Sequence, residues 1–457
     1  MSNTMIKDLT KGNVTKQLLV FALPLFLSNA LQAVYNIVDM IIVGQFIGGA
    51  GMSAVSIGGD VLHLLTFVAM GFSSAGQVLI ARDVGARNFE SVKKTIGTMF
   101  TFLFIASFAI SVVCYLVREP MLKLLNTPAE SFEYTLDYTV TCMVGLVFIY
   151  GYNIVSAILR GMGDSKRPFV FIGIAAILNI VLDILFVSVL DMEVFGAALA
   201  TVIGQGVSFV ASIVYLYVKR ESFCFDFKPS SFKMEKIAFK RILGLGLPMS
   251  IQAAAVSFSK VVLMAWINMF GVVYSALAGI FNKINVVSAI VSNSFTTAGS
   301  AMVGQNLGAG KDERIPLILK TVAVCGLVIS TALSLVLLIW PNAVFASFTS
   351  DAEVLKVAGI LVAPVILNLY GSATRSISFS LINGSGNTRL NLAVALIDGI
   401  ISRIGIAALL GFAFKLDCLG FWYGDSIAGF VPIMIGLWFL LSGGWRTQNK
   451  AIEKTEG

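Results

Sequence analysis

Long apolar segments with very few charges occupy most of this 457-residue chain, and they constrain its fold more than any other feature. Each segment reaches the roughly 20 residues that an α-helix needs to cross a ~30 Å hydrocarbon core. Composition agrees, because 57% of the residues are hydrophobic and 12% are charged, against about 25% charged residues in ordinary soluble proteins. A soluble fold needs far more polar surface, so these numbers exclude a water-soluble enzyme.

The apolar segments form two sets of six. Uninterrupted runs of this length predict helices, because the strands of a membrane β-barrel would be shorter and would alternate in polarity. We therefore predict an all-α polytopic membrane protein with twelve transmembrane helices. The predicted spans are approximately 17–43, 52–80, 95–117, 136–159, 169–190 and 195–218, then 242–269, 274–303, 315–339, 354–382, 390–414 and 419–441.

The two sets of helices resemble each other as an internal repeat. A displacement of 223 along the chain aligns Gly76 with Gly299, Gly85-Ala86 with Gly308-Ala309 and Gly161 with Gly384, and a displacement of 224 aligns Leu23-Pro24 with Leu247-Pro248. Membrane proteins are rich in Gly and Pro, but several matches at nearly one displacement argue against chance. Each half has six helices, an even number, so both halves begin and end on the same side of the membrane and have the same orientation. The sequence therefore predicts two parallel-repeat six-helix lobes around a central cleft.

The domain boundaries follow from the longest polar stretch, which lies at the midpoint of the chain. Residues 219–241 are basic and contain Pro229, as expected of a cytoplasmic linker. The prediction is an N-lobe over 1–218 with helices 1–6, a C-lobe over 242–441 with helices 7–12, and a cytoplasmic tail over 442–457.

The basic residues predict the orientation. Most of the 32 Lys and Arg residues fall in the N-terminus, the even-to-odd connections and the tail, against four on the opposite side: Arg118, Lys123, Lys356 and Lys415. The positive-inside rule then places both termini in the cytoplasm of a multi-pass cell (plasma) membrane protein. The net charge of +7 is thereby explained without a nucleic-acid partner.

Ionisable side chains within the spans are candidate functional residues, because each costs about 2.5–3.5 kcal/mol or more to insert. Asp39 and Asp183 lie about five residues before the outer ends of the first and fifth helices, and Thr201 lies a similar distance after the start of the sixth. At 1.5 Å rise per residue, all three share one level roughly 8 Å below the boundary. Asn179 shares the helix face of Asp183, and Tyr35 that of Asp39, as a possible supporting residue.

Two carboxylates, an amide and a hydroxyl at one depth can hold a proton or a small hard cation. Such a group can load and release H⁺, and the same oxygens suit Na⁺, so both coupling ions stay open. The alternative is that Asp39 and Asp183 only hydrogen-bond to neighbouring backbone.

The C-lobe carries a different set of charges, with Lys260, Asp398, Arg403 and Asp425 in or near its spans. Buried Lys and Arg are stable in membrane helices only when they are paired or face water. We therefore expect Lys260 or Arg403 to contact Asp398 or Asp425. This charge network either fixes helix packing or lines the substrate cavity.

No cofactor is predicted. The segment QNLGAGKD at 305–312 resembles a phosphate-binding loop, but its first glycine is out of register. In addition, Asp312 stands where Ser or Thr would bind Mg²⁺. The expected partners are small-molecule substrates and the lipid bilayer, and the chain is expected to act as a monomer.

Several sequence strings resemble the multidrug and toxic compound extrusion (MATE) family: ALPLFLSNALQAVYNIVDMIIVG (22–44), GQVLIARDVGARN (76–88), LRGMGDSKRP (159–168) and NIVLDILF (179–186), with second-half echoes VGQNLGAGK and INGSGNTR. The resemblance implies a secondary transporter that exports cationic or amphiphilic compounds against inward H⁺ or Na⁺. It also implies that Asp39, Asn179, Asp183 and Thr201 carry the coupling ion, as in members with an N-lobe aspartate site.

One branch of the family has acidic residues in the seventh and tenth helices, where this chain has Val256 and Ser372, so a C-lobe cation site is not expected. A lipid-linked saccharide flippase of the same superfamily is the alternative, kept open by Lys260, Arg375 and Arg403. A membrane-embedded enzyme is disfavoured, since the chain has one His and no paired catalytic motif.

Overall fold

The computed structural model describes residues 6–223 and 225–446. Within these ranges every regular element is helical, and no β-strand occurs. Twelve of the described helices are long and apolar enough to cross a membrane, which confirms the predicted all-α polytopic fold. Cys224 in the predicted linker and residues 447–457 of the predicted tail lie outside the described residues.

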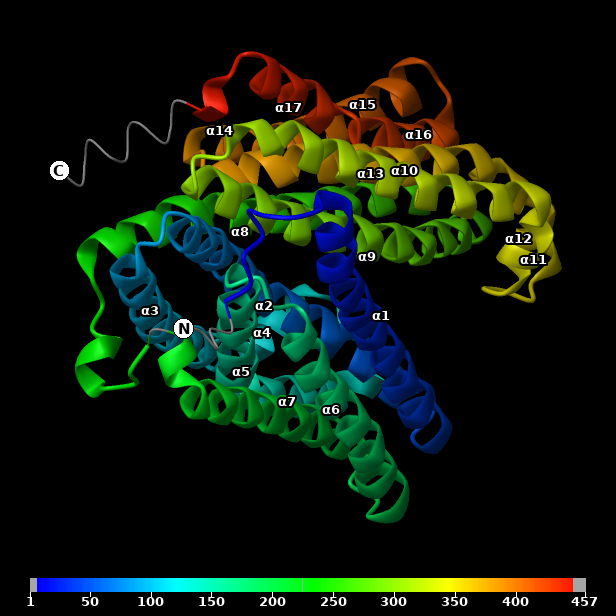
Figure 1. Cartoon of the computed structure of the whole chain (residues 1–457). Helices are drawn as coiled ribbons and strands as arrows, with labels where there is room; N and C mark the ends of the chain where they lie inside the picture. The colour runs from blue at the N-terminus through cyan, green and yellow to red at the C-terminus, as the bar shows by residue number, and fades with distance from the viewer. Residues whose placement is uncertain (1–5, 224, 447–457) are drawn as a thin grey trace. The chain divides into compact units, whose positions relative to one another are not determined.

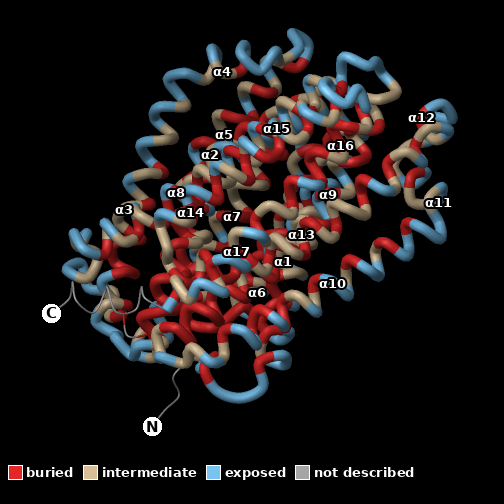
Figure 2. Tube along the Cα trace, turned by 90° about the horizontal axis from the view of Figure 1, so that it is seen from above, coloured by how far each residue is buried: buried red, intermediate tan, exposed pale blue. Residues whose placement is uncertain are grey.

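The first six spans come from the first half of the chain (Figure 1): α1 (Val14–Phe46), α2 (Gly49–Gly85), α3 (Phe89–Leu116), α5 (Phe132–Gly161), α6 (Lys166–Asp183) and α7 (Glu193–Val218). The short helix α4 (Arg118–Leu124) connects α3 to α5 and is mostly exposed (Figure 2). The bounds agree with the predicted spans to within several residues at most ends. The long α1 and α2 extend beyond the prediction because their ends continue past the apolar run.

The second six spans repeat this order: α8 (Lys236–Asn268), α9 (Val272–Gly308), α10 (Ile315–Ile339), α13 (Val362–Ser385), α14 (Thr388–Leu396) with α15 (Arg403–Ala408), and α16 (Asp417–Ala428) with α17 (Val431–Leu441). Two short helices, α11 (Pro341–Ala346) and α12 (Ala352–Val357), connect α10 to α13. α8 therefore begins within the predicted linker.

Among the residues that the structure describes, three π-helical turns interrupt the spans, and the apolar pattern does not predict them. One, Ile184–Val189, begins directly after Asp183 at the end of α6. The others are Ile397–Ser402 between α14 and α15, and Leu409–Ala413 after α15. Such turns are rare and often occur at functional sites, because they redirect side chains from the regular helical face.

Packing divides the chain into two compact units, each treated by itself below. The first contains Leu23–Gly246, and the second begins at Leu247 and also takes in Leu9–Ala22. Residues 9–22 were predicted in the N-lobe but pack with the second unit, and residues 242–246 were predicted in the C-lobe but pack with the first. The predicted boundaries differ from the observed ones because the end of α9 binds the segment before α1, and the end of α2 binds the start of α8. These are long-range contacts, which no local sequence pattern reveals.

The end of α9 binds the segment before α1. The Leu9 N–H donates to Gln305 Oε1 at 2.9 Å, and Asn306 Nδ2 donates to the Leu9 carbonyl at 3.1 Å. Lys311 Nζ donates to the carbonyl of Thr10 at 2.7 Å. The segment that resembles a phosphate-binding loop thus holds backbone of this chain.

The start of α8 is held in the same manner within the first unit. Arg241 Nη2 lies 2.9 Å from Asp83 Oδ1, near the end of α2. The ring of Phe239 packs edge-on against Phe102, with 5.2 Å between centroids. The repeat carries Arg82-Asp83 onto Gln305-Asn306, so the two anchors are counterparts in the two units.

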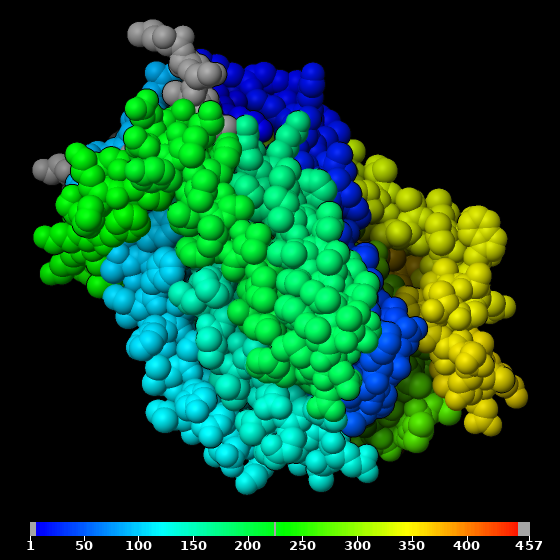
Figure 3. Space-filling model, turned by 90° about the horizontal axis from the view of Figure 1, so that it is seen from below, coloured from blue at the N-terminus to red at the C-terminus, as the bar shows by residue number. Residues whose placement is uncertain are grey.

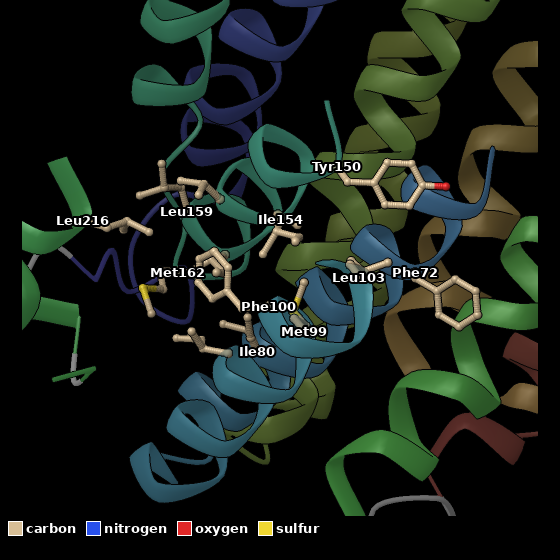
Figure 4. Packing of buried hydrophobic residues seen from close by; sticks show 14 of the residues in the cluster. Phe72, Ile80, Met99, Phe100, Leu103, Tyr150, Ile154, Leu159, Met162 and Leu216 are labelled. Carbon is tan, nitrogen blue, oxygen red and sulfur yellow. The ribbon is translucent and has the colours of Figure 1, made fainter. Parts of the chain in front are cut away.

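The core of the first unit lies between α2, α3, α5 and α7. Figure 4 shows its large apolar side chains: Phe72, Ile80, Met99, Phe100, Leu103, Tyr150, Ile154, Leu159, Met162 and Leu216. The hydroxyl of the fully buried Tyr150 donates to the Leu65 carbonyl at 2.8 Å, so its polar atom is satisfied. The second unit has a comparable core around α9, α13 and α16.

Two of the repeated glycines allow a close helix–helix approach. A Cβ at Gly161 would lie 2.8 Å from the carbonyl oxygen of Gln77, and one at Gly384 would lie 2.9 Å from that of Ser300. The displacement that aligns the two glycines also aligns Gln77 with Ser300. The same α2–α5 contact therefore recurs as an α9–α13 contact, which supplies the physical reason for the glycine repeat.

The linker between the spans packs on α3 through aromatic side chains, and polar contacts join the same two segments. Figure 3 shows the green atoms of this part of the chain beside the lighter blue of the α3 region. The Glu235 N–H donates to Thr98 Oγ1 at 3.1 Å, and Lys93 Nζ lies 3.1 Å from Asp226 Oδ2. The Ser231 hydroxyl and Lys93 both stabilise the ionised form, which lowers the pKa of Asp226 to about 2. This carboxylate therefore stays charged throughout the physiological pH range.

Candidate functional site

The N-lobe cluster, defined as Tyr35, Asp39, Asn179, Asp183 and Thr201, is assembled from three helices of the first unit. The helices α6 and α7 pack on each other. Asp39, Asn179 and Asp183 are 6%, 3% and 0% exposed, respectively. The carboxylates and the amide are thus withdrawn from water.

A hydrogen bond joins two side chains of this cluster, and a further polar contact reaches Tyr35 from outside it. Asn179 Nδ2 donates to Thr201 Oγ1 at 3.3 Å, which bridges α6 and α7. On α1, Gln32 Nε2 lies 3.5 Å from the Tyr35 hydroxyl. Asp39 and Asp183 lie close enough to interact electrostatically, so both pairs of the predicted coupling residues are brought together.

Four buried oxygens of the cluster lack hydrogen-bond partners among the described residues. They are Asp39 Oδ1, Asn179 Oδ1 and both carboxylate oxygens of Asp183. A buried acceptor without a donor costs about 1–3 kcal/mol, and more if it is charged. Two neighbouring carboxylates in such a place cannot both be ionised at low cost unless a cation lies between them. The arrangement suits a bound proton or a small cation with oxygen ligands.

Tertiary structure adds residues that the sequence reasoning did not select. Gln205, one turn beyond Thr201 on α7, interacts with the Tyr35 hydroxyl. From α5, Tyr138 and Cys142 lie within electrostatic reach of Asp39. The i, i+4 spacing from Thr201 could have revealed Gln205. Nothing in the sequence places α5 beside α1.

The C-lobe charges form a network within the second unit. Arg375 Nη2 lies 2.5 Å from Asp398 Oδ2, Arg403 Nη2 lies 3.7 Å from Asp398 Oδ1, and Arg403 also pairs closely with Asp425. Of the predicted residues, Asp398, Arg403 and Asp425 are thus brought together, and Arg375 joins them. Lys260 makes no ion pair with a described carboxylate, although Asp425 lies within electrostatic range.

The N-lobe cluster and the C-lobe network are related by the repeat. A displacement of 224 carries Asn179 onto Arg403 and Thr201 onto Asp425. The hydrogen bond of the first pair is therefore replaced by an ion pair in the second. The same displacement carries Asp39 onto Leu263, so the C-lobe lacks that carboxylate.

The described residues contain no group of three or more His, Cys, Asp or Glu side chains that could hold a metal ion. A Na⁺ ion at the N-lobe cluster would instead rely on two carboxylates together with amide and hydroxyl oxygens.

Solved structures similar to the chain share its fold along its entire length. A MOP superfamily transporter from Pyrococcus furiosus matches with a TM-score of 0.89 and 22% identity, covering 99% of each chain. An outward-facing multidrug resistance transporter of the MATE family matches with a TM-score of 0.88 and 22% identity, again over 99% of each chain.

Sequence relatives extend the comparison. Probable multidrug resistance protein YpnP of Bacillus subtilis is 30% identical over 309 residues, covering 67% of this chain and 68% of the relative. Probable multidrug resistance protein YoeA of the same organism is 27% identical over 93% of each chain. Probable multidrug resistance protein NorM of Thermotoga maritima is 26% identical, over 94% of this chain and 93% of the relative.

The MatE family model matches twice, over residues 24–185 and 248–409. The two matched ranges are related by the displacement that aligns Leu23-Pro24 with Leu247-Pro248, in agreement with the internal repeat. Because together they cover more than half of the chain, and because the fold and the relatives agree, the protein belongs to the MatE family, the multidrug and toxic compound extrusion family that its sequence resembles.

Proposed function

We propose that the protein is a secondary antiporter that exports cationic or amphiphilic organic compounds by alternating access, driven by inward movement of H⁺ or Na⁺. Membership of the MatE family supports export rather than an enzymatic reaction. The relatives named as multidrug resistance proteins support organic compounds as the substrates.

The observation that carries the coupling is the set of unpartnered oxygens in the N-lobe cluster. Asp39, Asn179 and Asp183 present four buried acceptors without donors among the described residues. A protein retains such a costly arrangement where an ion supplies the missing partner. Binding of H⁺ or Na⁺ would satisfy these atoms, and release of the ion would restore the negative charge. The cluster would thus have an ion-bound and an ion-free state, and an ion gradient would shift the balance between the two.

The flippase alternative is not favoured. It calls for a strongly cationic cavity that would hold a pyrophosphate. Of the three cations that kept it open, Arg375 and Arg403 are neutralised by Asp398 and Asp425, and Lys260 lies within electrostatic range of Asp425. The curated relatives quoted above are named as multidrug resistance proteins.

Transport by purified protein in liposomes tests the proposal. Liposomes loaded with a fluorescent organic cation such as ethidium receive an inward H⁺ gradient or an inward Na⁺ gradient, separately. We expect one of the two gradients to drive efflux above the rate of protein-free liposomes, and the effective gradient identifies the coupling ion. Equal rates with and without protein under both gradients would overturn the proposal.

Both termini are proposed to face the cytoplasm, because the basic residues are concentrated on that side. Single cysteines in a Cys-free background report this orientation. Cysteines at Ser230 and Gly310 should react with a membrane-impermeant maleimide only in inverted vesicles, and a cysteine at Asp191 only in intact cells. Labelling of Ser230 in intact cells would contradict the orientation.

A further inference from the structure

The segment 225–241, which leads from the linker into α8, packs along the side of the membrane-spanning helix α3 (Figure 1). The Glu235 N–H donates to Thr98 Oγ1 at 3.1 Å. The Phe239 ring packs against Phe102, with 5.2 Å between centroids. Thr98 and Phe102 both fall inside the predicted third span. The segment therefore lies beside the part of α3 that enters the bilayer, at the level of the lipid headgroups.

Close contacts fix this segment in place. A Cβ at Gly97 would overlap the carbonyl oxygen of Ser231, so only glycine allows the backbone of the segment to approach α3 this closely. One turn further along α3, the Thr101 hydroxyl donates to the Phe232 carbonyl. The Phe232 ring also packs edge-on against Phe100. The outward side chains of the segment are thus presented from a fixed surface.

Four lysines of the segment are exposed and form what we call the linker lysine surface: Lys228, Lys233, Lys236 and Lys240. None of the four takes part in an ion pair with a carboxylate in the described part of the chain, where the pairs of this segment are formed by Asp226 and Arg241. Their ammonium groups are therefore available to an external anion.

The two carboxylates of the segment do not balance these lysines. Asp226 Oδ2 lies 3.1 Å from Lys93 Nζ, a residue of α3. Glu235 Oε2 accepts a hydrogen bond from the Ala238 N–H at 2.7 Å, in the first turn of α8. Arg241 is matched by Asp83. The four lysines therefore face a single carboxylate, that of Glu235, and the surface keeps an excess of positive charge.

Exposed apolar side chains lie between the lysines, which indicates the kind of anion. Met234 is 43% exposed, Ile237 58% and Leu243 38%. Lysines interleaved with exposed apolar residues are typical of segments at a membrane interface, where the apolar side chains enter the acyl boundary and the ammonium groups extend to the headgroups. A soluble polyanion, such as a nucleic acid or an acidic protein, would use the charges but leave these apolar side chains in water.

We propose that the linker lysine surface binds the phosphate groups of anionic phospholipids, so that these lipids are enriched around the segment. Met234 and Ile237 contact the acyl chains of the same lipids. The attraction is electrostatic at an exposed surface, so added salt weakens it. This lipid site goes beyond the proposed function and is independent of whether the protein exports a compound.

A fluorophore placed on the segment tests the proposal. A single cysteine at Ser230, in a Cys-free background, is labelled with bimane, because Ser230 is exposed and lies between Lys228 and Lys233. The full-length protein is reconstituted in phosphatidylcholine vesicles with a minor share of phosphatidylglycerol. The same amount of acyl-chain nitroxide, which quenches bimane, is carried by phosphatidylglycerol in one sample and by phosphatidylcholine in the other.

We expect the labelled phosphatidylglycerol to quench more strongly, corresponding to a local enrichment of about fivefold, the effect of roughly one lysine at an anionic surface. Because both samples have the same total composition, the difference reports which lipid lies beside the segment. Equal quenching by the two lipids would overturn the proposal and favour a soluble acidic partner for the lysines.

Variants assign the preference to the lysines. The triple change Lys233→Gln, Lys236→Gln and Lys240→Gln should make the two lipids quench equally, whereas Arg at the same three positions should retain the preference. The charge-matched control changes three exposed lysines elsewhere in the chain to Gln and should leave the preference unchanged: Lys16, Lys166 and Lys320. A preference that persists in the first triple variant contradicts the proposed site.

Salt provides a second readout on the wild-type protein, which keeps the proposal testable if the triple variant does not fold. Raising NaCl to about 1 M shortens the screening length to about 3 Å, so the preference for phosphatidylglycerol should fall several-fold. A preference that is unchanged at high salt would show that the lysines do not hold the lipid, and it would overturn the proposal.

Discussion

Asp39→Asn is expected to reduce gradient-driven efflux to the background rate of protein-free liposomes. The amide keeps the shape of the side chain but neither takes up and releases a proton nor neutralises Na⁺. Asp183→Asn should have nearly the same effect, because the two carboxylates lie within electrostatic reach of each other. The measurement is ethidium efflux under whichever gradient drives the wild-type protein.

Expression and thermal stability should persist in both variants. Asp39 Oδ1 and the Asp183 carboxylate have no hydrogen-bond donors in the described residues, so removing the charge also removes a desolvation cost. Asp60→Asn serves as the matched control, since Asp60 also lies in a membrane-spanning helix, α2, but is exposed and outside the cluster. Wild-type efflux in both cluster variants would assign Asp39 and Asp183 a structural role only.

Arg403→Met should lower the free energy of unfolding by about 3 kcal/mol or more, because breaking a buried ion pair leaves an uncompensated charge. Arg403 is 4% exposed and contacts both Asp398 and Asp425. Asp398 is fully buried and lies against both Arg375 and Arg403, so these arginines are its main compensation. Thermal unfolding of the detergent-solubilised protein measures the loss.

A double variant separates the lost ion pair from lost packing. Arg403→Met combined with Asp425→Leu removes both partners, so most of the stability should return, while Asp398 keeps Arg375. Arg389→Met is the matched control, since Arg389 is exposed at the start of α14. If Arg403→Met unfolds at the wild-type temperature, the network does not stabilise the second unit.

The depth of the candidate residues could be predicted because a helix rises by a constant amount per residue. Asp39, Asp183 and Thr201 are each a fixed number of residues from a helix end, so the prediction of a common level required no knowledge of packing. The residues that surround them could not be predicted in this way. Tyr138 and Cys142 come from α5, and only the packing of α5 in the first unit brings them near Asp39.

The C-lobe shows the same limit. Helix spacing alone does not say whether Arg403 reaches Asp398, Asp425 or both, because the π-helical turn Ile397–Ser402 alters the face that each side chain presents. For the same reason Arg375, on α13, was not predicted to pair with Asp398. The predicted contact of Arg403 with these aspartates is present, whereas Lys260 instead lines a pocket.

The sequence by itself determined the twelve helices and the repeat, because hydropathy and chain length are local properties that the bilayer converts directly into spans. It also determined which charges fall within the predicted spans. Only the tertiary structure decided that residues 9–22 pack with the second unit, that four acceptor oxygens of the N-lobe cluster lack donors in the described part of the chain, and that Lys260 lines a pocket. These features depend on distances between helices far apart in the chain, and hydropathy does not encode them.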